Sequence, residues 1–192
     1  MITYERYMNV HKGGLLKELD LEHITLREPL IEHVGHLPII ASFLHTYLEN
    51  KNNVNLGNTL IMLSIHDIGE TVQGDILTYK KTKEDEQKEV EAALKIIPSE
   101  LKPYLLEYEE LKSLEAKFAK SIDSIAPFLH EFTLPEITLK KFDYYNFNED
   151  TILDRKRKYF TWDKTMEDLF DCCYKKFKQI RAEANTQFKP II

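Results

Sequence analysis

The chain has 192 residues, of which 43% are hydrophobic and 30% are charged, and it contains only six glycines. This length and composition fit a compact, largely helical domain with its own core, and they exclude a disordered or fibrous protein. The formal net charge of −6 argues against nonspecific nucleic-acid binding, because such binding needs a broad positive surface.

The predicted elements are all helical. Apolar residues that recur at steps of three and four from Leu37 to Leu48 predict an amphipathic helix over about 32–50. The next apolar segment predicts a short buried helix that ends at Gly69, and a loop is expected over 69–80. The remaining helices are predicted at about 82–97, 99–111, 113–130 and 150–184. The fold is therefore expected to be all-α.

Neither a membrane span nor a disulfide is expected. No apolar run approaches the roughly 18 residues of a span, and the first residues lack the apolar core of a signal peptide. The two cysteines, Cys172 and Cys173, are adjacent, so they cannot form an ordinary structural disulfide across the fold. We expect a cytoplasmic protein with one domain, since repeats and linker-like stretches are absent from the sequence.

Ionisable residues interrupt the apolar faces of three predicted helices. His33 lies four residues before Leu37 on the first helix, and Asp67 lies four residues after Leu63 on the second. Asp123 lies on a face that is otherwise rich in alanine and isoleucine. An unpartnered carboxylate in such a place costs several kcal/mol or becomes protonated, and a shared cation removes this cost.

Two imidazoles and two carboxylates suit a mid-row divalent metal that keeps positions open for water or substrate. Each residue alone has a simpler interpretation, because a lone core histidine is usually structural and a helical aspartate is usually a cap or a salt-bridge partner. The directly adjacent pair His66-Asp67, with His33 upstream and Asp123 downstream, favours the metal. We predict one divalent ion held by these four residues, with Mn, Co, Mg, Fe, Ni and Zn all compatible.

The order of these residues resembles the ligand signature of the HD-domain superfamily, which is named for its His-Asp doublet. The resemblance spans about residues 27–130 and is greatest to the 5′-deoxynucleotidase-like branch. It implies one domain over 1–192, with an HD helical bundle at about 27–130 and a C-terminal helical extension at about 131–192. The motifs that carry the resemblance lie at 32–33, 66–70, 74–76, 107–110 and 115–123.

The resemblance implies a metal-dependent phosphohydrolase that cleaves phosphomonoesters, above all nucleoside or deoxynucleoside 5′-monophosphates. A bound cation would polarise the phosphoryl group and lower the pKa of a water molecule. Glu70 is implied to handle protons, and Asp75 to orient water or the sugar of the substrate. We expect Gly69 to free the backbone so that the Glu70 carboxylate turns toward the site.

The phosphate dianion also needs positive partners. Arg27 is one candidate, because its planar guanidinium can bind phosphate oxygens in a bidentate way. Lys81 is the other candidate, although lysines in such a run are usually solvated. His36, one turn after His33, could contact a metal ligand, but a surface or core position is the favoured expectation for it.

One metal ion is expected rather than two. Dinuclear members of the superfamily generally draw additional histidine ligands from the interval between the doublet and the last aspartate, and this chain has no histidine between residues 68 and 129. Aromatic residues at 142–147 are expected to make core or subunit contacts, which is compatible with a homodimer.

Two alternatives stay open from the sequence. The same scaffold could carry a phosphodiesterase or a nucleotide triphosphohydrolase, which would release different products. It could also be a non-catalytic module that binds a nucleotide or a partner and uses the metal only for folding.

Overall fold

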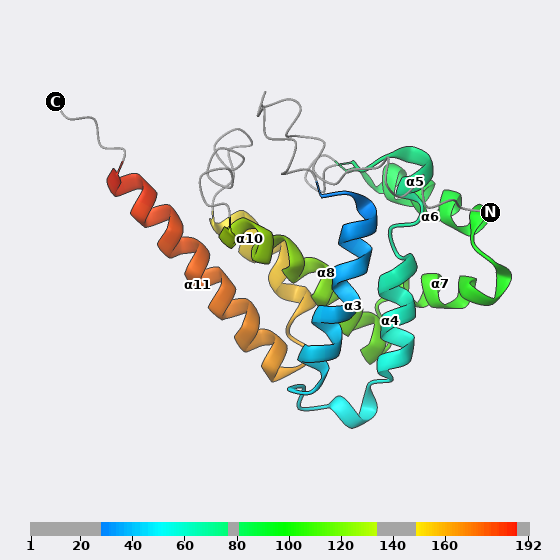
Figure 1. The fold of residues 1–192 in the computed structure, drawn as a ribbon, viewed down its shortest axis with the longest axis horizontal. Coiled ribbons are helices and arrows are strands. Elements are labelled where there is room, and N and C mark those ends of the chain that lie inside the picture. The colour runs from blue at the N-terminus through cyan, green and yellow to red at the C-terminus, as the bar shows by residue number, and fades with distance from the viewer. Residues whose placement is uncertain (1–27, 77–80, 134–148, 188–192) are drawn as a thin grey trace.

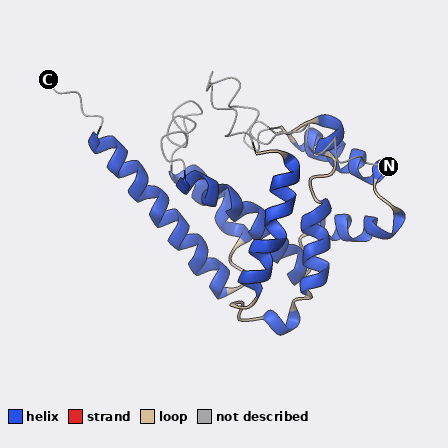
Figure 2. Ribbon diagram, viewed as in Figure 1, coloured by secondary structure: helices blue, strands red, loops and turns tan. Residues whose placement is uncertain are grey.

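The computed structural model of the protein describes residues 28–76, 81–133 and 149–187. These residues form helices joined by loops and turns and contain no β-strand (Figure 2), which confirms the predicted all-α class. The α-helices are α3 (Leu30–His45), α4 (Leu56–Ile65), α5 (Glu70–Gln73), α6 (Lys83–Ile96), α7 (Lys102–Glu110), α8 (Leu114–Thr133), α10 (Glu149–Lys156) and α11 (Lys164–Gln187), with 3₁₀ turns at Lys51–Asn53, Ser99–Leu101 and Arg157–Tyr159.

The main core lies where α3, α4 and α8 pack together, and α11 packs against α8 (Figure 1). In Figure 1, α11 forms the edge of the molecule opposite α5, α6 and α7. The main cluster of buried residues includes Leu37, Leu63, Phe118 and Phe170, so each of these four helices contributes to it. The predicted boundary near residue 130 stays a prediction. Among the described residues, no helix has the length and apolar character needed to cross a membrane.

A second, smaller hydrophobic cluster joins the end of α4 to α6 and α7. Its buried members are Ile65 and Ile68 beside the His-Asp doublet, Ala93 and Ile97 at the end of α6, and Leu105 on α7. The doublet therefore lies in a turn whose two flanking isoleucines are both buried in this small cluster.

Polar caps fix where two helices near this turn begin. At the start of α4, the backbone N–H of Asn58 donates to the Asn55 side chain at 3.2 Å. At the start of α6, Thr82 and Asp85 form a reciprocal capping box. These caps set the register of both helices, and with it the places of the residues that follow them.

The second predicted helix ends earlier than the sequence suggests. α4 ends at Ile65, the doublet lies in turns, and α5 then begins at Glu70, so the prediction of a loop over 69–80 is wrong for residues 70–73. The loop prediction fails because Gly69 has ordinary right-handed helical dihedral angles, φ −61° and ψ −32°, so a helix can begin directly after it. In this segment the φ angle becomes positive at Gly74 (81°), where α5 ends.

Gly69 permits close packing rather than an unusual turn. A Cβ atom at this position would lie 2.3 Å from the backbone oxygen of Glu89 on α6. Backbone oxygens in a capped helix cannot move aside as a flexible side chain can. The expectation that Gly69 frees the backbone to turn Glu70 is therefore wrong, and its missing side chain instead lets α6 approach the His-Asp turn.

Replacing Gly69 with alanine is expected to lower the free energy of unfolding by at least about 1–3 kcal/mol, because the new methyl group overpacks against backbone. The matched control is Gly35→Ala on α3, where a Cβ would meet nothing within 4 Å. That change should be neutral or should stabilise by about 0.4–1 kcal/mol, through the lost freedom of the unfolded chain. Urea unfolding followed by circular dichroism measures both, and equal stabilities of the two variants would contradict the packing role.

The predicted continuous helix over 150–184 is also wrong. A 3₁₀ turn and residues 160–163 separate α10 from α11. Phe160 is fully buried, and the Trp162 Nε1–H donates to the Ser121 hydroxyl on α8 at 2.9 Å. Asp163 then accepts the backbone N–H of Thr165 at 3.0 Å, as α11 begins. At this break Trp162 bonds to α8 and the Phe160 ring packs against Phe170 of α11.

Candidate metal centre

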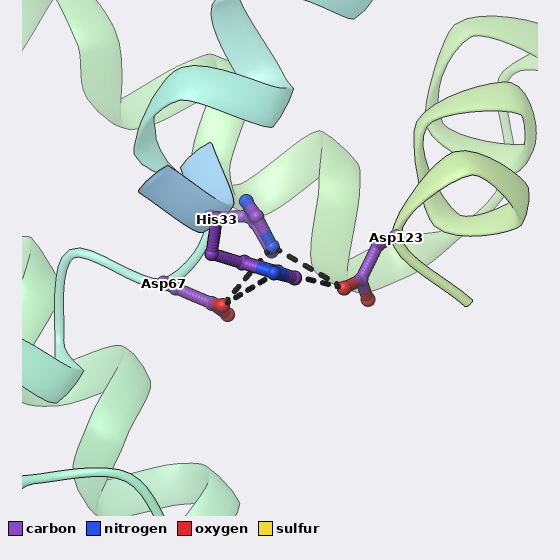
Figure 3. A group of neighbouring side chains, drawn as sticks. His33, Asp67 and Asp123 are labelled. Atoms are coloured by element: carbon purple, nitrogen blue, oxygen red, sulfur yellow. Dashed lines mark ion pairs between the residues drawn. The ribbon is translucent and has the colours of Figure 1, made fainter. Parts of the chain in front are cut away.

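The structure brings together the four predicted metal ligands. His33 comes from α3, His66 and Asp67 from the turn after α4, and Asp123 from α8. One ligand atom from each lies within 4.8 Å of the others. The two histidines and Asp67 are buried and Asp123 is half-buried. Figure 3 shows Asp67 and Asp123 approaching His33 from opposite sides.

The four side chains direct one nitrogen or oxygen atom each toward a common position. His33 Nε2 lies 3.5 Å from Asp67 Oδ2 and 3.5 Å from Asp123 Oδ1. His66 Nε2 lies 3.2 Å from the same Asp67 oxygen and 3.5 Å from the same Asp123 oxygen. Two imidazole nitrogens and two carboxylate oxygens therefore converge, one atom from each residue.

The orientation of His66 shows that this donor set fits a cation. Its Nδ1–H donates to the Leu63 carbonyl at 3.0 Å, so in the neutral ring the Nε2 lone pair points toward two carboxylate oxygens. Such an arrangement is favourable only when a proton or a cation lies between these atoms. Burial alone would lower the pKa of His66, but the carboxylates of Asp67 and Asp123 raise it to about 10.

Metal binding at pH 7.5 is expected to release about one proton, because a His66 with a pKa of about 10 is protonated there and must lose that proton to act as a ligand. Apparent affinity should therefore rise with pH, about tenfold per unit, until the pH reaches that pKa. Calorimetric titration of the chelator-stripped protein with Mn²⁺, in two buffers of different ionisation enthalpy, counts the protons.

The control for this titration is His45→Gln, since His45 bonds the Val54 carbonyl instead of any of the four ligands. This variant should release the same number of protons as the parent. A heat of binding that does not change with the buffer would contradict a protonated His66.

Glu28 orients the other histidine, and the sequence analysis missed it. Its Oε2 lies 3.5 Å from His33 Nδ1, and its Oε1 lies 3.1 Å from His36 Nδ1. His36 is thus one contact away from His33 through Glu28, which agrees with the less favoured of the two roles expected for this residue. The three-residue step from His33 to His36 was the sequence signal that the two rings lie on one helix face. No comparable spacing in the sequence indicated a role for Glu28.

The carboxylate of Asp123 has partners on the side away from the histidines. Lys120 Nζ donates to its Oδ2 at 2.9 Å, and the Tyr108 hydroxyl donates to the same oxygen at 3.0 Å. Burial opposes ionisation, but Lys120 and the two histidines hold the pKa of Asp123 well below its ordinary value. Both partners lie in motifs that carried the family resemblance, although no role was expected for either.

A second group of carboxylates adjoins the first. One oxygen each from Asp67, Glu70 and Glu89 lies within 4.8 Å of the others, and Glu70 is only 2% exposed. Lys81 forms an ion pair with Glu89. Burial would lower the pKa of Lys81, but Glu89, with help from Glu70 and Asp67, raises it. The structure thus places Glu70 next to the predicted metal ligands and a charged Lys81 beside Glu89.

The structure does not test the roles expected for the remaining predicted residues. Asp75 is half-buried in the loop after α5, and the potential metal-ligand groups among the described residues do not include it. Arg27 lies outside the described residues. The roles expected for Asp75, Lys81 and Arg27 stay predictions.

Comparisons with known proteins identify the family and the fold. The HD domain model matches residues 21–161. The chain is 27% identical over 149 residues to the 5′-deoxynucleotidase hdd1 of Schizosaccharomyces pombe (strain 972 / ATCC 24843), a match that covers 70% of this chain and 66% of that protein. The crystal structure of a predicted metal-dependent phosphohydrolase from Magnetospirillum magnetotacticum MS-1 has the same fold, with a TM-score of 0.70, 22% identity, and coverage of 92% of this chain and 90% of that one.

Proposed function

Because the chain belongs to the HD-domain family, we propose that it is a metal-dependent phosphohydrolase whose substrates are nucleoside or deoxynucleoside 5′-monophosphates. The observation that carries the proposal is the convergence of His33, His66, Asp67 and Asp123 on one shared space. The likeness to a 5′-deoxynucleotidase supports the monophosphate substrate. The proposal includes a cytoplasmic location, a homodimeric state and no nucleic-acid substrate.

The four converging side chains would hold one divalent cation. When bound, the cation would supply Lewis acidity to the phosphoryl group and make water acidic enough to act as a nucleophile near neutral pH. The protein prepares this site in advance, because the Leu63 carbonyl fixes the ring of His66 and Glu28 faces the ring of His33.

Glu70 is the proposed proton carrier. Its carboxylate is buried and lies in one group with that of Asp67, so it is close to the ligands and shielded from bulk water. From there it can accept the proton of the attacking water and return it to the sugar oxygen that leaves phosphorus. Asp75, in the loop after α5, is the proposed contact for water or the sugar. Arg27 and Lys81 are the proposed phosphate partners.

A nucleotide panel tests the proposal. Purified protein is stripped with a chelator, reloaded with Mn²⁺, Co²⁺ or Mg²⁺, and incubated with 5′-mono-, di- and triphosphates, 3′-monophosphates and cyclic nucleotides. We expect inorganic phosphate and nucleoside from the 5′-monophosphates, and only when metal is present.

Product analysis separates the alternatives. Release of pyrophosphate or triphosphate would replace the proposal with a triphosphohydrolase, and a nucleotide product from cyclic substrates would replace it with a phosphodiesterase. Bound metal without any turnover would identify a non-catalytic module.

A further inference from the structure

The two oxygens of the Asp123 carboxylate have different surroundings. Oδ1 lies 3.5 Å from the Nε2 atoms of both His33 and His66. Oδ2 points away from them and accepts hydrogen bonds from Lys120 at 2.9 Å and from Tyr108 at 3.0 Å. One oxygen is thus directed at the proposed metal position, while the other is already occupied by protein donors.

Contacts with two tyrosine side chains hold Lys120 in place, whereas a solvated surface lysine has no such contacts. Its ammonium donates to the Tyr108 hydroxyl at 3.1 Å and lies 5.2 Å from the centroid of that ring. It also lies 5.8 Å from the ring centroid of Tyr159, and its side chain is 28% exposed. Tyr108 itself is 4% exposed. Residues from α7, α8 and the 3₁₀ turn Arg157–Tyr159 therefore fix one positive charge beside Asp123.

We propose that Lys120 and Tyr108 are positioning residues that keep Asp123 a one-oxygen ligand through Oδ1 and place one positive charge beside the loaded centre. This inference rests on the proposed metal-dependent function and deepens it. Hydrogen bonds to Oδ2 prevent the carboxylate from rotating to offer both oxygens, and they draw negative charge away from Oδ1. A ligand that donates less charge leaves a bound cation more electrophilic.

The charge of Lys120 also changes the electrostatic potential at the position where a substrate would bind. Two carboxylates and two neutral imidazoles neutralise a divalent cation, and Glu70 and Glu28 lie next to these ligands, so the Lys120 ammonium offsets part of the nearby negative charge. This charge lowers the electrostatic repulsion that a phosphate dianion meets at the centre. The same charge repels the metal ion, so the inference predicts that the lysine favours turnover and does not improve metal retention.

The test is Lys120→Met, which keeps the unbranched stem and removes the charge and the donor. At saturating Mn²⁺ its kcat/KM should fall by about 10- to 100-fold, whereas its affinity for Mn²⁺ should equal or exceed that of the parent. The acidic limb of its pH–rate profile should move to higher pH, because the cation becomes less electrophilic. A merely structural lysine would produce neither the split between turnover and metal affinity nor the shift in pH.

Further variants keep the test decisive if Lys120→Met folds poorly, which thermal melting would show. Tyr108→Phe removes one donor and keeps the charge. Its kcat/KM should therefore fall by less than that of Lys120→Met, again without a loss of Mn²⁺ affinity. Lys120→Arg should recover part of the activity. Lys117→Met, one turn earlier on α8, is the matched control and should behave as the parent does.

Two results would overturn the inference. One is a kcat/KM for Lys120→Met equal to that of the parent at saturating metal, and the other is a metal affinity at least tenfold weaker with turnover restored by excess Mn²⁺. If the parent hydrolyses no nucleotide, the function fails but the metal measurement still decides the inference, since removal of Lys120 must then leave Mn²⁺ binding as tight or tighter.

Discussion

Replacing Asp67 with asparagine is expected to abolish stoichiometric metal binding and to lower kcat/KM by about 1000-fold or more. Asp67 Oδ2 is the oxygen that faces the Nε2 atoms of both His33 and His66, so the change removes a charged ligand from the middle of the group. The loss corresponds to the several kcal/mol of transition-state stabilisation that a metal ion supplies in such reactions. Elemental analysis after dialysis against Mn²⁺ measures the metal, and phosphate release measures the activity.

Asp163→Asn is the matched control for this variant. Asp163 is also buried, but it caps α11, and asparagine caps a helix about as well as aspartate does. The control should therefore keep both metal and turnover. An Asp67→Asn protein that still holds one equivalent of metal and hydrolyses substrate at the parent rate would remove Asp67 from the proposed centre.

Replacing Glu70 with glutamine is expected to lower kcat by about 10²- to 10⁴-fold while the metal content stays that of the parent. Glutamine preserves the shape of this buried side chain but cannot accept a proton from water. Steady-state kinetics on a 5′-monophosphate, together with metal analysis of the same sample, checks both parts of the expectation.

Glu86→Gln, at an exposed position of α6, makes the same chemical change away from the site and should leave kcat as it is. If Glu70→Gln lost its metal together with its activity, Glu70 would be a ligand and not a proton carrier. If its kcat equalled that of the parent, Glu70 would have no part in the reaction.

The sequence alone was sufficient to predict the fold class and which residues converge. His33 and Asp123 each interrupt an apolar helical face, Asp67 continues the spacing of the apolar face of α4 into the turn that follows, and faces of this kind must pack against one another. Spacing along a helix decides which face a residue occupies, so this information is local. The start of α6 was predictable for the same reason, because the capping box that sets it lies within four residues.

The features that the sequence did not reveal depend on contacts between distant segments. Gly69 has an ordinary conformation, and its role follows only from the backbone of Glu89, twenty residues later. The break before α11 depends on the burial of Phe160 and on the bond from Trp162 to Ser121. The donors to Asp123 include Tyr108, fifteen residues away on another helix. No local periodicity encodes such pairings.

The two hydrophobic clusters anchor different parts of the candidate metal centre. α3 and α8, which carry His33 and Asp123, pack in the large cluster, whereas the turn with Asp67 is flanked by isoleucines of the small one. A displacement of about 1 Å in catalytic geometry can cost about 100-fold in rate, so slight loosening between the clusters would disable the site. Heat can therefore inactivate this enzyme at temperatures where its helices have not yet melted.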